Sequence, residues 1–274
     1  MAESLGEILK LMVQLLSVAK AVGSAVLAKG APIGNLGALF LARASQSAYS
    51  AGLLAQNGLN ADAMSVGRTV TEMLIDFRYI VLDPDKRIKQ FEDYGDVAKF
   101  KLMKAVDALH GGTLDQNAMK ILEKRHDDAR INHPDSKRNW AGADIFQRAE
   151  EIDKRTTAKG INYVEEVYRI SYVDACNASH SGYGTLEYAM ARDDDGDIAS
   201  VCFGRMPPQP KPVETAFGML LVLIGVVFDA NKLDEKSEVA DQIRAVHAAW
   251  NAYVEKKAAQ AGVELAKMAP LDRA

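Results

Sequence analysis

Cysteine is almost absent from this chain. Among its 274 residues only Cys176 and Cys202 occur, and they form no CxxC pair. A disulfide framework or a structural zinc site needs more cysteines or a closer spacing. We therefore expect a protein of the reducing cytoplasm with neither a bound metal nor a cofactor.

A strong charge of one sign is also missing. The formal net charge is −4, from 33 basic and 37 acidic residues. This balance argues only mildly against nucleic-acid binding, because a local basic patch can exist within an acidic total. Lys137 and Arg138 beside Trp140 could pair and stack with a nucleotide, but three such residues are ordinary in a surface loop. Nucleic acid is therefore a weakly supported partner.

The chain shows no convincing membrane segment, export signal, internal repeat or domain linker. Residues 216–228 form a run of thirteen apolar residues, whereas a spanning helix needs about 17 to 25. Glu3 and Glu7 stand where a secretory signal would carry basic residues. We therefore expect a buried core helix at 216–228, no membrane partner, and one helical domain over residues 1–274.

Helical periodicity is what the chain has in abundance. Ser4 followed by Glu7 predicts a capping box at the start of the first helix, and Asn60 or Asp62 is the expected cap of the third. The acidic turn at 193–197 predicts a small β-hairpin near residues 185–204. Because helical periodicity covers most of the chain, we expect an all-α fold class, namely a multi-helix bundle. We expect helices at residues 4–29, up to about 56, 60–82, 84–109, 114–131, 144–157, 160–181, 216–228 and 234–268.

Residues 60–82 form the expected central helix, because their apolar side chains fall on two opposite faces. Between these faces runs a narrow polar strip that contains Arg68, Glu72, Asp76 and Tyr79. If both apolar faces are covered, the charges of this strip must be paired. The strip is therefore either a structural ion-pair network or the lining of a ligand-binding cleft, and both alternatives remain open.

Two blocks of sequence resemble the bacterial family named domain of unknown function 5677. The first, residues 51–94, contains Arg68-Thr-Val-Thr-Glu72 followed by Asp83-Pro84, and the second contains NWAGADIFQRAEE and YVEEVYRISYVDACNASH, which ends at His180. The resemblance covers roughly residues 50–180, with a core motif region at 50–182. It implies an intracellular all-α domain related to nucleotide-binding helical bundles, and it adds Tyr168 and His180 to the candidate ligand-binding residues.

Catalytic patterns are weak. Catalytically active members of the related helical superfamily carry an arginine and a histidine separated by four to six residues, and this chain has no such pair, so we expect no metal-independent RNase activity. Cys176 and His180 share a helical face, but packing explains such a pair as well as catalysis does. The acidic turn lacks the ligand order of a calcium loop.

The leading hypothesis is a noncatalytic binding or regulatory module that receives a nucleotide or another small anionic ligand in a polar cleft. The candidate ligand-binding residues are Arg68, Glu72, Asp76, Tyr79, Tyr168 and His180. The alternatives are a metal-dependent hydrolase or nuclease, which uses the same carboxylates and histidine, and a structural oligomerisation domain, for instance a homodimer. Ligand identity, a protein partner and the pathway stay open.

Overall fold

The structure is a computed structural model, and it describes residues 2–133, 139–156, 163–173, 175–176, 190–201 and 204–262. Over these residues the protein is an all-α bundle, as expected from its periodicity. His180, Cys202, Lys137 and Arg138 lie outside the described residues.

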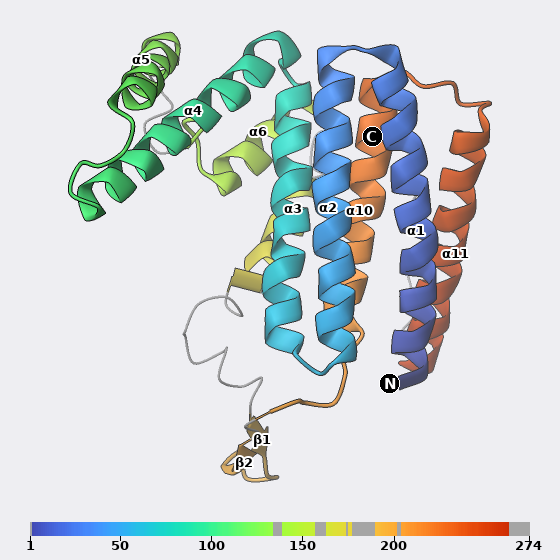
Figure 1. Cartoon of the computed structure of the whole chain (residues 1–274). Helices are drawn as coiled ribbons and strands as arrows, with labels where there is room; N and C mark the ends of the chain where they lie inside the picture. Colours follow the sequence, from blue (N-terminus) through green and yellow to red (C-terminus); the bar gives the residue numbers. More distant parts are fainter. Residues whose placement is uncertain are drawn as a thin grey trace.

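Five long helices form the main bundle: α1 (Ala2–Lys29), α2 (Pro32–Gln56), α3 (Asn60–Val81), α10 (Lys211–Ala230) and α11 (Glu238–Gln260). Figure 1 shows them side by side, with α10 behind α2 and α11 beside α1. The apolar helix α10 packs against α1, α2 and α3, so the run at 216–228 is a buried core helix. By length and composition, Ser4–Lys29 and Lys211–Ala230 could also span a membrane, but a core helix passes the same test.

Close packing of α2 depends on its small residues. Ala44, Ala48, Ala51 and Ala55 are fully buried, and their small side chains let neighbouring helices approach closely. At Gly37, a Cβ atom would lie 2.9 Å from Val227 and 3.2 Å from Phe77. Larger side chains at these positions would therefore push α2 away from α3 and α10.

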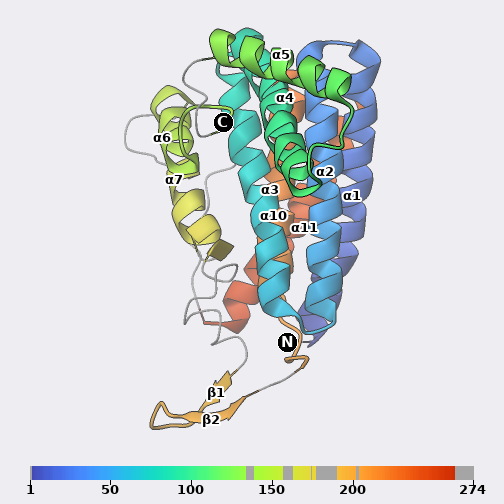
Figure 2. The same ribbon diagram turned by 60° about the vertical axis from the view of Figure 1, so that its left-hand side comes forward.

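The remaining elements lie around α3. Helices α4 (Pro84–Leu109) and α5 (Gln116–Asn132) extend away from the bundle as a pair (Figure 1). Helix α6 (Ile145–Thr156), α7 (Tyr163–Val167) and the π-helix η1 (Tyr168–Tyr172) follow one another along α3 (Figure 2). Strands β1 (Met190–Arg192) and β2 (Ile198–Val201) form the expected antiparallel hairpin.

Two expected helix caps are wrong. Ser4 lies inside α1, where its hydroxyl is hydrogen bonded to the Tyr253 hydroxyl of α11 at 2.8 Å, so tertiary packing replaces the capping box. At the start of α3 the cap residue is Leu59. Asn60 donates instead to the carbonyl of Pro207 at 3.0 Å and accepts from the backbone of Gln209, which ties the proline-rich connector to the bundle.

Candidate functional site

Arg68 and Glu72 form the expected i,i+4 ion pair on α3. The Nε of Arg68 lies 3.7 Å from a carboxylate oxygen of Glu72, and the two side chains are 27% and 33% exposed. The hydroxyl of Tyr172 donates to the same carboxylate oxygen at 2.9 Å. Burial and the neighbouring Glu72 carboxylate raise the pKa of Tyr172, so this phenol remains a donor. The pair is therefore partly solvated.

The π-helix η1 completes this cluster. Tyr168 stacks on Tyr172 with the ring centroids 5.0 Å apart, and the Arg68 guanidinium lies 5.5 Å from the Tyr172 ring. Arg68 also donates to the sulfur of Cys176 at 3.4 Å. The structure thus brings together Arg68, Glu72 and Tyr168 of the candidate residues.

Asp76 belongs to a separate contact. Its carboxylate is paired with Arg148 of α6, which is itself 7% exposed and lies over the Trp140 ring at 5.5 Å. Burial raises the pKa of Asp76 to about 6, against the opposing effect of the Arg148 charge. Asp76 therefore pairs with Arg148, which lies 72 residues away in the sequence. Glu72, one turn before Asp76 on α3, carries the same negative charge and cannot pair with it.

Tyr79 serves as an aromatic anchor of α3. It is 6% exposed, with its ring 3.6 Å from the Arg87 guanidinium and in edge contact with Trp140 at 5.7 Å. Arg87 donates to the Tyr79 carbonyl at 2.5 Å and to Glu151 at 2.7 Å. Tyr79 and Asp76 thus help to hold α3 against α4 and α6, which is a structural arrangement.

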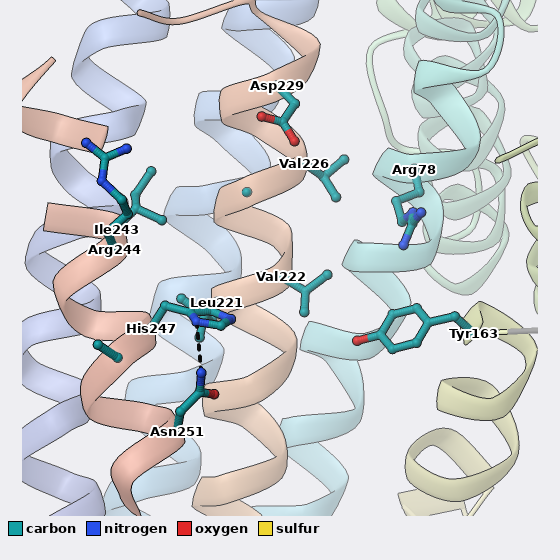
Figure 3. A pocket seen from close by; sticks show the side chains of 12 residues that line it. Arg78, Tyr163, Leu221, Val222, Val226, Asp229, Ile243, Arg244, His247 and Asn251 are labelled. Carbon is teal, nitrogen blue, oxygen red and sulfur yellow. Dashed lines mark hydrogen bonds between the residues drawn. The ribbon is translucent and has the colours of Figure 1, made fainter. Parts of the chain in front are cut away.

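A cavity of about 400 Å³ lies on another side of α3, and we call it the α10–α11 cavity. Figure 3 shows Arg78 of α3 and Tyr163 of α7 on one side, with α11 on the other and α10 between them. The residues that line it are Arg78, Tyr163, Leu221, Val222, Gly225, Val226, Asp229, Ile243, Arg244, His247, Ala248 and Asn251.

The cavity exists because α10 and α11 separate along their length. At Gly218 a Cβ atom would lie 3.8 Å from Trp250, which is ordinary contact. Two helical turns further, at Gly225, a Cβ atom would meet nothing within 4 Å. Since residues seven apart lie on nearly the same face of a helix, both glycines face the same region. The space opens between these two levels.

Arg78 is the unusual group of this cavity. It is 7% exposed, and burial lowers the pKa of its guanidinium, with Asp153 and Tyr163 acting in the opposite direction. Among the described residues, no carboxylate lies within ion-pair distance of Arg78, and the Asp153 carboxylate attracts it from farther away. The Asp153 carboxylate accepts instead from the backbone amides of Val164 and Glu165 at 3.0 and 2.8 Å.

Among the polar groups of the opposite wall and rim, the buried Nε2 of His247 has no hydrogen-bond partner in the described part of the chain, and the others are engaged or exposed. Arg244 donates to Asp241 at 2.5 Å and to the Glu235 carbonyl at 3.1 Å. His247 and Asn251 are hydrogen bonded to each other at 3.3 Å. Asp229 is exposed at the rim, and partial burial together with Glu235 raises its pKa. Arg78 is therefore the lining cation without a hydrogen-bonded side chain or a direct ion pair among the described residues.

Sequence reasoning missed Arg78, Tyr163 and Gly225. A helical pattern could have identified the first, because Gly67, Thr71, Leu74 and Arg78 recur at the spacing of one buried face. An arginine that continues such a face, with no acidic residue one turn away, has no ion-pair partner on its own helix. Tyr163 had no comparable pattern.

The fold and these contacts define an all-α bundle with a half-open, largely apolar cavity beside its central helix. The model of the family of unknown function DUF5677 matches residues 35–197, which is more than half of the chain. The chain belongs to this family, as the resemblance over residues 50–180 indicated. The match includes Arg78 and Tyr163, whereas α10 and α11 follow it. No curated protein and no solved structure matches the chain.

Proposed function

We propose that this protein is a binding module that receives a small anionic ligand in the α10–α11 cavity. The observation that carries the proposal is Arg78, a guanidinium that is 7% exposed, lines the cavity and has no ion-pair partner among the described residues. The cavity volume of about 400 Å³ falls in the range of small-molecule sites. This places the proposed ligand site on a different face of α3 from the Arg68–Glu72 pair.

A buried cation without a partner destabilises a fold, because desolvation is not offset by attraction. An anionic ligand offsets this cost, since the planar guanidinium can donate two parallel hydrogen bonds to a carboxylate or a phosphate. Tyr163 lies beside Arg78 with its hydroxyl directed toward the cavity (Figure 3), so it can supply a further donor. The apolar residues Leu221, Val222 and Val226 of α10 line the same space.

The stability of the unliganded protein distinguishes an arginine that binds a ligand from one that stabilises the fold. Arg78→Met removes the charge and keeps an apolar side chain of similar length. If the charge of Arg78 is compensated only by a bound ligand, we expect the unliganded variant to be at least as stable as the wild type in urea denaturation. If Arg78 instead stabilises the fold through Asp153, the loss should be about 3 kcal/mol or more, and the proposal fails.

Binding is then measured by thermal shift with inorganic phosphate, AMP and octanoate. We expect at least one of these anions to raise the Tm of the wild type in a saturable manner. Arg43→Met is the matched control, because Arg43 is an exposed arginine of α2 that does not line the cavity and has no ion pair in the described part of the chain. The control should respond like the wild type and Arg78→Met should not. Equal responses of the two variants would contradict the proposal.

A further inference from the structure

We infer that the ligand of the α10–α11 cavity is a monoanion with an apolar body, namely an amphiphilic carboxylate, rather than a nucleotide with several phosphates. The inference rests on the proposed function and specifies its ligand class. It follows from the number of free cations, the position of the acidic groups and the chemistry of the cavity floor.

The cavity offers one cation for a ligand. Among the lining residues the other arginine, Arg244, is paired with Asp241 and bonded to the Glu235 carbonyl. Polyphosphate sites use several cationic or backbone donors, because each phosphate adds charge. Arg78 alone matches a single negative charge.

Acidic groups at one end of the cavity oppose a larger negative charge. Asp229 lines the rim, and the proximity of Glu235 contributes to its raised pKa. These two carboxylates would repel a diphosphate or triphosphate that extends toward them. A single carboxylate held at Arg78 avoids this contact, because its remaining part is uncharged.

The floor of the cavity suits an apolar chain better than a nucleobase. Leu221, Val222 and Val226 of α10 and Ile243 of α11 line the cavity, with Val222 and Val226 directed toward the side of Arg78 (Figure 3). Tyr163 is the phenol ring of the lining, and the His247 ring on the α11 side is the other aromatic surface. The amide of Asn251 is already bonded to His247. Burial of methylene groups would supply the affinity, and each added CH₂ would strengthen binding by roughly fourfold.

The experiment is titration calorimetry of the full chain with octanoate, 1-octanol, inorganic phosphate and ATP. Octanoate is used below its micelle-forming concentration, and 1-octanol is its uncharged match. We expect saturable binding of octanoate, and binding weaker by about tenfold or more for 1-octanol, phosphate and ATP. Arg78→Met should weaken octanoate binding to the level of 1-octanol.

Cavity filling tests the location of the apolar body. Gly225→Leu places a side chain in the empty space, and Gly95→Leu is the matched control, since Gly95 is an exposed helical glycine of α4 with nothing within 4 Å of its Cβ position. We expect at least about a tenfold loss of octanoate affinity for the first variant and none for the second. Val222→Phe fills the cavity from an adjacent turn, and it replaces Gly225→Leu if that variant does not fold.

The outcomes separate the ligand class from the proposed function. Arg78-dependent binding of phosphate or ATP, without binding of octanoate, would refute the amphiphilic monoanion and keep the anion site. Octanoate binding that is unaffected by cavity filling would place it elsewhere and refute the inference. If none of the four compounds binds in an Arg78-dependent manner, the inference fails, and loss of stability in Arg78→Met would show that the proposed function fails as well.

Discussion

Removal of Arg148 should destabilise the protein strongly at pH 7 and weakly at pH 5. The Asp76 and Arg148 side chains are only 19% and 9% exposed, and they connect α3 to α6. Removing one member of a buried pair typically costs about 3 to 5 kcal/mol, because the other charge loses its partner. We expect the lower end for Arg148→Met at pH 7, since Asp76 can limit the cost by taking up a proton.

The pH dependence follows from the pKa of Asp76, which burial raises from 3.8 to about 6. Because the folded state binds this proton more tightly than the unfolded state, its stabilising effect is complete below about pH 4 and is lost as the pH rises through about 6. A shift of about two pKa units corresponds to roughly 3 kcal/mol, an upper bound given partial exposure. The wild type should therefore lose stability between pH 5 and pH 7.

At pH 5 the Asp76 carboxyl is largely protonated, so Arg148→Met should cost only about 1 kcal/mol for a lost hydrogen bond and packing. Asp76→Asn keeps the shape without the charge, and in this background the cost of Arg148→Met should be the same at both pH values. Urea denaturation of the four proteins at pH 5 and pH 7 gives the coupling energy. Equal coupling at the two pH values would refute the ionic explanation.

Three further variants test separate parts of the structure by chemical or thermal denaturation. Glu72→Ala should cost less than about 1 kcal/mol, because the Arg68–Glu72 pair is partly solvated, and a loss near 3 kcal/mol would show a buried pair instead. Trp140→Ala should cost about 3 to 5 kcal/mol, since the ring is 6% exposed and packs on Tyr79; a loss below about 1 kcal/mol would contradict this packing. Gly225→Ala should raise the free energy of unfolding by about 0.5 to 1 kcal/mol, because its methyl group enters empty space in a helix, and destabilisation would show that the space is occupied.

The helices were predictable from the sequence because their burial is periodic. In α3 the fully buried Val70, Phe77 and Ile80 fall on one predicted face and Ile75 on the opposite one. Trp140, which the sequence placed in a surface loop, packs against Tyr79 of α3 and Phe91 of α4. Such local patterns carry enough information to define a helix and its faces.

Partners distant in sequence were not predictable in the same way. Arg68 and Glu72 of the predicted polar strip form an ion pair within α3, but the sequence could not connect Asp76 to Arg148 or Ser4 to Tyr253. The predicted helix at 160–181 contains a π-helical turn at Tyr168–Tyr172, which shifts the faces of the following residues. A sequence pattern with a period of 3.6 residues does not reveal a single wider turn.

The cavity required two observations that no local pattern combines. Gly225 alone in an apolar helix predicts either close helix packing or a vacant position, and only the position of α11 decides between them. Arg78 alone predicts an ion pair on a helix, and only the engagement of Asp153 with the amides of α7 leaves it without one. Each feature has an ordinary structural explanation when taken separately. Their convergence on one cavity supports our proposal that the ligand binds there and not at the more conspicuous polar strip.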